Sequence, residues 1–242
     1  MKIIGVIPAR LNSTRLPLKP LHPICGKPLV QWVYEGASQY PYFDRLVVAT
    51  DSEMIQEKVK EFGGKVAMTS CEHTSGTSRM YEVASETELK PDDILVNIQG
   101  DEPLINGQVL NILLNNNFKN NKEIGASTVA RKFVSEEEKK SPHYVKAIID
   151  KNGYALDFTR KWKEEFSLKT VLCHIGLYAY KKWALDQFMK LPPTVREREE
   201  KLEQLRFADN LNIFHVSVVK DKLIGVDTIE DVKSVENELR KQ

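Results

Sequence analysis

Hydrophobic residues in the first half of the chain fall into short continuous runs, the pattern of strands that are buried on both faces. Such runs occupy residues 2–8, 45–50, 66–68 and 94–98. The segments between them are short and carry apolar residues at helical spacing, so strands and helices alternate along the chain. This alternation predicts a doubly wound, mostly parallel sheet.

The helices between these strands have recognisable starts. Pro28 is expected in the first turn of a helix over about 28–38, because proline is pre-organised for that position. Asp51 or Ser52 is expected to cap the next helix. A run of small polar residues at 73–79 leads into a third helix, and a fourth is expected near 106–115.

The pattern changes near residue 125, where strands separated by turn signals follow one another. Strands are expected at 125–131, 144–149, 154–159, 170–180 and 213–219, helices at 182–190 and 197–208, and an exposed mobile connection at 161–169. We interpret 1–242 as one domain. Within it, about 125–210 is an antiparallel insertion, which we expect to form the part of the functional site that binds a second substrate.

Composition excludes several functional classes. A chain of 242 residues with 41% hydrophobic and 29% charged residues can bury a full core. The sequence contains no apolar run of 18 residues, the length needed to span a bilayer, and no signal peptide precedes the first strand. A cytoplasmic location is therefore expected. The net charge of +1 argues against nucleic acid as a partner. Cys25, Cys71 and Cys173 lie far apart, and we expect reduced, mostly buried thiols.

Two adjacent carboxylates follow the strand over 94–98. Gly100 is succeeded by Asp101, Glu102 and then Pro103, which cannot continue a ladder. Ligands of open α/β sheets bind outside the carboxyl ends of the strands. A carboxylate held there suits Mg²⁺, which takes oxygen ligands and often binds together with a substrate phosphate. The alternative is a surface turn with two solvated acids.

The loop after the first strand combines cations with five prolines, from Pro8 to Pro28. Proline disfavours helix, so the loop is expected to be extended and stiff. It lacks the GxxxxGK[ST] pattern, and any phosphate would be held largely by side chains. Arg10, Arg15 and Lys19 could clamp a triphosphate, because arginine pairs phosphate oxygens bidentately and lysine acts as a point charge. A solvated basic loop is the alternative.

The segment 73–79 is a second candidate for nucleotide contact. Free backbone N–H groups at a helix N-terminus can hold a phosphate or the polar edge of a base. Helix capping alone would explain Ser75 and Thr77. Capping does not require His73 and Arg79, which leaves a binding role for this segment open.

A second apolar run, at 223–226, ends in a single aspartate, Asp227. We expect a strand end there, as before Asp101. Thr228 and Asp231 form a capping box for the last helix, and capping is the alternative role of Asp227. Two aspartates at strand ends together with the cationic loop suit Mg²⁺-assisted chemistry on a triphosphate.

Six segments resemble, in chain order and over nearly the whole chain, the CMP-KDO synthetases, which are 3-deoxy-manno-octulosonate cytidylyltransferases. These segments are 7–20, 73–79, 97–104 (Asn-Ile-Gln-Gly-Asp-Glu-Pro-Leu), 174–178 (His-Ile-Gly-Leu-Tyr), 202–206 and 225–231. The resemblance implies a GT-A-like, Rossmann-related nucleotidyltransferase fold and a homodimer. It also implies transfer of CMP from CTP to the anomeric 2-hydroxyl of a 3-deoxy-2-ulosonic acid, with release of pyrophosphate, for lipopolysaccharide or capsule synthesis.

The resemblance further implies roles for individual residues. Asp101 and Asp227 look like Mg²⁺ ligands, and Arg10, Arg15 and Lys19 match the residues around the triphosphate. The positions that match nucleotide recognition are Ser75, Gly76 and Arg79, and those that match the sugar acid are Gln99, His174, Tyr178, Glu203 and Gln204. The sugar carboxylate would also lie near Arg10, and the 125–210 insertion would carry sugar binding and dimerisation. By local pattern alone, His174 would be a packed strand residue and Glu203 a solvated helix charge.

Three departures from the family pattern concern the sugar. Leu18 stands where the family has glycine, Ser78 where it usually has an acid, and the stretch 159–163 lacks the family's prolines. KDO, 8-amino-KDO or a sialic-type acid could therefore be the substrate. Other hypotheses are a sugar-1-phosphate nucleotidyltransferase, a GT-A glycosyltransferase, for which 101–103 lacks the Asp-x-Asp pair, and a non-catalytic nucleotide-binding protein.

Overall fold

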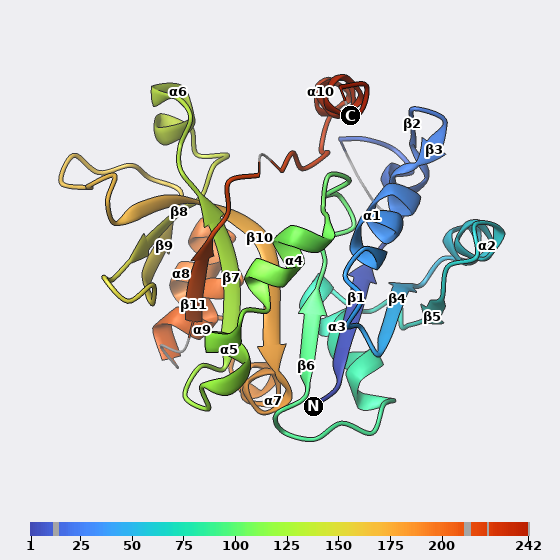
Figure 1. The fold of residues 1–242 in the computed structure, drawn as a ribbon, viewed down its shortest axis with the longest axis horizontal. Helices are drawn as coiled ribbons and strands as arrows, with labels where there is room; N and C mark the ends of the chain where they lie inside the picture. The colour runs from blue at the N-terminus through green and yellow to red at the C-terminus, as the bar shows by residue number, and fades with distance from the viewer. Residues whose placement is uncertain (12–14, 211–213, 222, 242) are drawn as a thin grey trace. The chain divides into compact units, whose positions relative to one another are not determined.

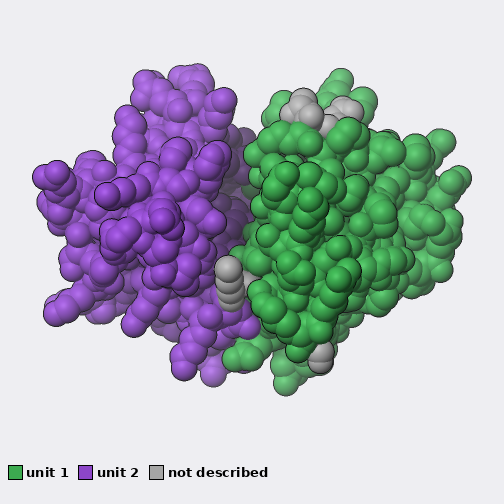
Figure 2. All heavy atoms as spheres, turned by 90° about the horizontal axis from the view of Figure 1, so that it is seen from above, with its two compact units in different colours: residues 1–110, 223–242 green, residues 111–222 purple. Residues whose placement is uncertain are grey.

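The structure is a computed structural model that describes residues 1–11, 15–210, 214–221 and 223–241. The chain divides into two compact units (Figure 2). Unit 1 comprises residues 1–110 and 223–242, and unit 2 comprises residues 111–222. The C-terminal segment therefore belongs with the N-terminal half. The single-domain interpretation of 1–242 and the dimerisation role of 125–210 stay predictions.

Four parallel strands in the spatial order β6-β1-β4-β5 form the sheet of unit 1 (Figure 1). They are β1 (Ile3–Pro8), β4 (Arg45–Thr50), β5 (Val66–Met68) and β6 (Ile94–Asn97). Successive side chains of a strand point to opposite faces, yet the adjacent residues Val47 and Val48 are both fully buried. The sheet is thus covered on both faces, and the predicted parallel strands are confirmed.

Helices cover this sheet. The residues that were expected to mark the starts of the first two helices lie at those starts in the structure. Pro28 directly precedes the first helix, and the hydroxyl of Ser52 accepts a hydrogen bond from the Ile55 N–H to cap the second. The helices of unit 1 are the short 3-10 helix η1 (Lys19–Leu21), α1 (Leu29–Ser38), α2 (Glu53–Glu61), α3 (Gly76–Ser85) and α10 (Ile229–Leu239). Helix α4 (Gly107–Leu113) begins in unit 1 and ends in unit 2.

The loop after β1 is less extended than its prolines predicted. Pro20 lies in the first turn of η1, where a residue without an N–H group is tolerated. The strands β2 (Pro23–Ile24) and β3 (Lys27–Pro28) form a hairpin. Cys25 (φ 45) and Gly26 (φ 82) adopt the two left-handed conformations that a two-residue hairpin turn requires.

The sheet of unit 2 has the order β11-β7-β10-β8-β9, in which only β11 and β7 are parallel. Its strands are β7 (Ala126–Arg131), β8 (Lys146–Ile149), β9 (Ala155–Thr159), β10 (Val171–Lys181) and β11 (Phe214–Val218), and its helices are α5 (Asn116–Asn120), α6 (Glu136–Lys140), α7 (Lys182–Lys190), α8 (Val195–Glu200) and α9 (Gln204–Asn210). Ile213, the first residue of the expected strand 213–219, lies outside the described residues. Stacked aromatic rings, among them Tyr180, Phe188 and Phe207, fill the core of this unit.

The structure differs from the sequence-based expectations in several places. The helix expected over 197–208 is two helices, because Lys201 adopts a left-handed conformation (φ 53) that ends α8. Helix α6 was not expected at all. The cysteines are not mostly buried, since Cys25 lies in the hairpin turn and Cys71 in another turn, and both are exposed. Cys173, on a central strand of unit 2, is the buried one.

Candidate functional site

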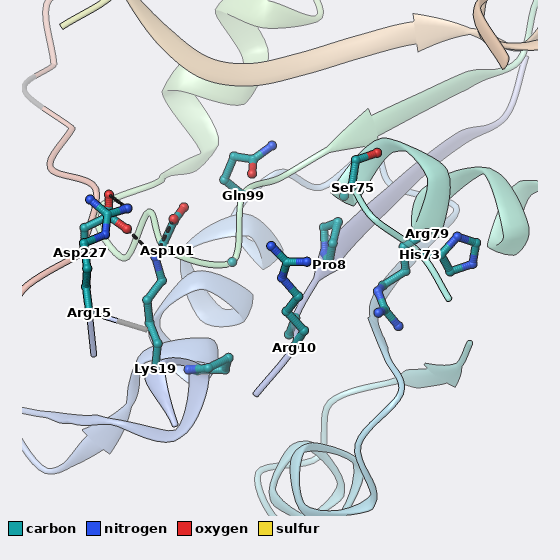
Figure 3. A pocket seen from close by; sticks show the side chains of 14 residues that line it. Pro8, Arg10, Arg15, Lys19, His73, Ser75, Arg79, Gln99, Asp101 and Asp227 are labelled. Carbon is teal, nitrogen blue, oxygen red and sulfur yellow. Dashed lines mark hydrogen bonds and ion pairs between the residues drawn. The ribbon is translucent and has the colours of Figure 1, made fainter. Parts of the chain in front are cut away.

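A cavity of about 430 Å³ lies in unit 1 at the carboxyl ends of β1 and β6 (Figure 3). Its walls come from the loop after β1, the N-terminus of α3, the turn after β6 and the segment before α10. The lining residues are Pro8, Ala9, Arg10, Arg15, Lys19, Pro20, His73, Ser75, Gly76, Arg79, Gln99, Gly100, Asp101 and Asp227. The volume is in the range of small-molecule pockets. All predicted site residues of unit 1 therefore lie around one cavity.

At one end of the cavity two carboxylates share one ammonium group. The Lys19 Nζ lies 2.7 Å from Asp101 Oδ2 and 2.9 Å from Asp227 Oδ1. The other carboxylate oxygen of Asp227 lies 2.9 Å from Arg15 Nη2. Residues separated by most of the chain are thus joined into one charged cluster, which Figure 3 shows on the side of the cavity away from His73.

Asp227 reaches this cluster without the strand that was expected before it. The segment 223–226 is not a strand, and the Val226 N–H instead donates to the carbonyl of Asp101 at 2.8 Å. On the other side, the Asp231 carboxylate accepts from the N–H groups of Asp227 and Thr228 at 2.9 and 2.8 Å. Asp227 is therefore placed by the predicted capping box of α10 and by one bond to the Asp101 turn.

The shared contacts keep both partners charged. Burial acts to raise the pKa of Asp227, but the hydrogen bond and charge of Lys19 and the charge of Arg15 outweigh it, so the pKa is lowered. Burial acts to lower the pKa of Lys19, and the charge of Asp101 with the hydrogen bonds to both aspartates outweighs it, so the pKa is raised. Lys19 and Asp227 are therefore both charged at neutral pH.

Two glycines let the walls approach closely. A Cβ on Gly100 would lie 2.6 Å from the carbonyl oxygen of Pro8, which is closer than atoms can pack. A Cβ on Gly76 would lie 3.2 Å from the Pro8 ring. Next to Gly76, the Ser75 hydroxyl accepts from the Ser78 N–H at 3.1 Å and caps α3. The turn after β6 and the start of α3 thus pack directly against the end of β1.

The opposite end of the cavity holds a basic pair. Arg79 is only 3% exposed; its Nη1 donates to the Thr69 hydroxyl at 2.5 Å and its Nη2 lies 3.4 Å from Asp51. The ring of His73 is paired with the carboxylate of Glu82. Of these residues, His73 was not among the predicted site residues. The signal for it was present, because capping of α3 does not require a histidine there.

The remaining predicted residues belong to unit 2. His174 and Tyr178 lie on β10, Glu203 immediately precedes α9, and Gln204 begins that helix and is buried. The His174 ring contacts the Thr128 hydroxyl at 2.9 Å, and burial lowers its pKa to about 3. Burial and the charge of Glu203 raise the pKa of Tyr178. Their role toward the sugar acid stays a prediction.

Asp101 and Asp227, called the acid pair from here on, are suited to hold Mg²⁺ together with oxygen atoms of a substrate. Both carboxylates contact one nitrogen, so both can contact one small cation. In the part of the chain that the structure describes, no group of three or more His, Cys, Asp or Glu side chains is arranged to hold a metal ion. Mg²⁺ is commonly held by one or two carboxylates plus substrate phosphates, which two aspartates beside a cationic cavity would allow.

A cavity at the carboxyl ends of parallel strands lies where open α/β proteins bind their ligands. The family model described as Cytidylyltransferase matches residues 4–214. A cytidylyltransferase from Leptospira borgpetersenii shares the fold, with a TM-score of 0.67 at 19% identity over 100% of this chain and 88% of the other. The class is therefore that of the cytidylyltransferases.

Closer relatives define the family. A 3-deoxy-manno-octulosonate cytidylyltransferase of Fusobacterium nucleatum is 41% identical over 99% of this chain and 98% of its own, and that of Saccharophagus degradans is 42% identical over 99% of each. A structure of CMP:2-keto-3-deoxy-manno-octonic acid synthetase complexed with CTP superposes with a TM-score of 0.91, at 35% identity over 100% and 99% of the two chains. The chain belongs to the 3-deoxy-manno-octulosonate cytidylyltransferase family.

These comparisons confirm the expected fold class, an α/β nucleotidyltransferase fold with a mostly parallel sheet. Among the described residues, no helix is both long and apolar enough to cross a bilayer. The expected cytoplasmic location and homodimer stay predictions.

Proposed function

We propose that this protein transfers CMP from CTP to the anomeric 2-hydroxyl of 3-deoxy-manno-octulosonate and releases pyrophosphate. The observation that carries the proposal is that Asp101 and Asp227 both contact the Lys19 ammonium group in the cavity. In a chain so similar to named cytidylyltransferases, such a cluster suits a triphosphate substrate. The product would be an activated sugar for lipopolysaccharide or capsule synthesis.

In this proposal the basic residues of the cavity bind the triphosphate. Arg10, Arg15 and Lys19 line the cavity, and the charges of Arg15 and Lys19 are held there by ion pairs to Asp227 and Asp101 before a ligand arrives. Ser75, Gly76 and Arg79 would hold the nucleoside part, through the N-terminus of α3 and a buried guanidinium. Attack by the sugar hydroxyl on the α-phosphorus then depends on alignment and charge stabilisation.

Asp101 and Asp227 would hold the Mg²⁺, which when bound neutralises charge on the phosphate oxygens. Asp227 is ionised at neutral pH, as a metal ligand must be. The capping box of α10 and the Val226 bond place this residue. Lys19 contacts both aspartates, so its ammonium group would lie close to the phosphate oxygens that the Mg²⁺ binds.

The sugar acid would contact Gln99 in the cavity, and His174, Tyr178, Glu203 and Gln204 of unit 2 by family resemblance. His174 is neutral at pH 7 because its pKa is lowered to about 3, so it would act as a hydrogen-bonding group and not as a cation. We assign the sugar's carboxylate to Arg10, since a guanidinium binds a carboxylate bidentately.

Pyrophosphate release from CTP, Mg²⁺ and KDO tests the proposal. Asp101→Asn should keep the fold and reduce turnover at least about 100-fold, because one metal ligand loses its charge. The matched control is Asp92→Asn, at an exposed aspartate preceding β6, which should be as active as the parent protein. Full activity of Asp101→Asn would remove Asp101 from the metal site.

Substrate choice is tested with the same assay. KDO, 8-amino-KDO and a sialic acid are each supplied with CTP, and turnover should be fastest with KDO. Each NTP is also added alone with Mg²⁺, and CTP should raise the melting temperature most, because a ligand that binds the native state stabilises it. CTP binding without turnover of any ulosonic acid would favour a non-catalytic nucleotide-binding protein.

A further inference from the structure

Lys19 occupies the position that a shared cation would take between the acid pair. Its ammonium contacts an oxygen of Asp101 and an oxygen of Asp227 at once, as the dashed lines in Figure 3 show. Only 15% of its side chain is exposed. The protein by itself therefore supplies a counter-ion to the two carboxylates.

Charge balance makes this contact consequential. Asp101 and Asp227 contribute two negative charges, and Lys19 and Arg15, which also pairs with Asp227, contribute two positive charges. A divalent cation approaching this neutral cluster would meet an ammonium group within a few ångströms, where like charges repel strongly in a partly buried site. The acid pair should then attract free metal only weakly.

A triphosphate changes that balance. It carries several negative charges and would enter a cavity whose basic side chains include Lys19 and Arg15. Lysine has a long flexible side chain and can follow a new anion without moving its backbone. Its backbone is held in place: Lys19 begins η1, and Leu18 before it adopts a left-handed conformation (φ 52).

We propose that Lys19 is an exchangeable counter-ion of the acid pair, so that the divalent metal binds only after the nucleotide. The triphosphate takes over the ammonium, and Asp101 and Asp227 become available to the metal. The identity of the nucleotide in this inference rests on the proposed function. The exchange itself rests on the contacts of Lys19.

Binding of Mn²⁺ without nucleotide tests the first half of the proposal, with the loss of the free-ion signal in electron paramagnetic resonance as the readout. Lys19→Met should bind Mn²⁺ at least tenfold more tightly than the parent protein, because it leaves the acid pair with a net negative charge. Lys27→Met is the matched control. It removes a lysine of the same segment that pairs with Glu35, and it should bind Mn²⁺ as the parent does.

The double variant Lys19→Met with Asp101→Asn locates the gained metal site. It should lose the added affinity if that site is the acid pair. Lys19→Gln, which keeps a hydrogen-bond donor, replaces Lys19→Met should the methionine variant fail to fold. Equal Mn²⁺ affinity of the parent and the folded Lys19 variant would overturn the proposal.

Binding of CTP in metal-free buffer with a chelator tests the second half. Lys19→Met should bind CTP about tenfold more weakly than the parent protein, so one substitution strengthens metal binding and weakens nucleotide binding. A purely structural role of Lys19 would move both affinities in the same direction, and that result would also overturn the exchange. Neither measurement requires turnover, so a failed exchange leaves the proposed reaction standing, and absent turnover leaves the exchange standing.

Discussion

Individual residues in and next to the cavity wall are constrained by the local backbone. Leu18 is 47% exposed and has a φ of 52, in the left-handed region that costs a non-glycine residue about 1–2 kcal/mol. Gly100 is needed because any side chain would collide with the Pro8 carbonyl. Such costs concentrate where a site must hold a set geometry.

Leu18→Gly should raise the free energy of unfolding by about 0.5 to 1 kcal/mol. Glycine removes the left-handed cost, and its greater freedom in the unfolded chain offsets only part of that gain. Urea unfolding measures the change. Val134→Gly is the control, at a residue that is 66% exposed and not left-handed, and it should lower the stability. A destabilised Leu18→Gly variant would contradict the strain at Leu18.

His174 should make the protein less stable in mild acid. Its pKa is about 3 in the folded state against an ordinary value near 6.5, so between these values the unfolded chain binds a proton that the folded chain does not. The free energy of unfolding should fall by about 1 to 2 kcal/mol from pH 7 to pH 5 through this residue. Urea unfolding at both pH values measures it.

His174→Gln should reduce this pH dependence without abolishing it, because burial also lowers the pKa of His215. His143→Gln, at an exposed histidine, should leave the pH dependence as it is in the parent protein. An unchanged pH dependence in His174→Gln would show that the folded protein protonates His174 normally.

At the scale of elements, the starts of two helices place functional residues at the cavity. The start of α3 places Ser75 and Gly76 in the cavity wall, and the start of α10 places Asp227. In both, a side chain caps the first turn, so the local sequence determines where the helix begins. The end of α8 at Lys201 shows the converse, because no glycine or proline marks that break.

Asp231→Ala should lower both stability and activity. The Asp231 carboxylate accepts from the N–H groups of Asp227 and Thr228, so its loss costs about 1 kcal/mol and loosens the backbone of a metal ligand. Denaturant unfolding and pyrophosphate release measure the two effects. Glu230→Ala, at an exposed residue of the same turn, should change neither by as much. Undiminished turnover of Asp231→Ala would show that Asp227 does not depend on the cap.

At the scale of the whole molecule, the residues proposed for the nucleotide belong to unit 1, and most of those proposed for the sugar acid belong to unit 2. The cavity for the nucleotide is lined by residues of unit 1 alone, and four of the residues proposed for the sugar acid belong to unit 2. Substitutions in the two units should therefore have separable effects on the two substrates.

Tyr178→Phe should raise the KM for KDO several-fold and leave the affinity for CTP in the absence of sugar unchanged. The hydroxyl of Tyr178 stays protonated because its pKa is raised, so it can donate to a sugar oxygen. Calorimetric titration with CTP and steady-state kinetics with KDO separate the effects. Tyr42→Phe, at an exposed tyrosine of unit 1, is the control for both. Weaker CTP binding by Tyr178→Phe would contradict the division of substrates.

The parallel strands of unit 1, most helix starts, the capping box at Thr228 and the family could all be predicted from the sequence, because each of these depends on local pattern or on short motifs. The contact of Lys19 with both Asp101 and Asp227, and the hydrogen bond to the Asp101 turn that takes the place of an expected strand before Asp227, became apparent from the folded structure. These features depend on contacts between residues far apart in the chain, and local propensity carries no information about such contacts.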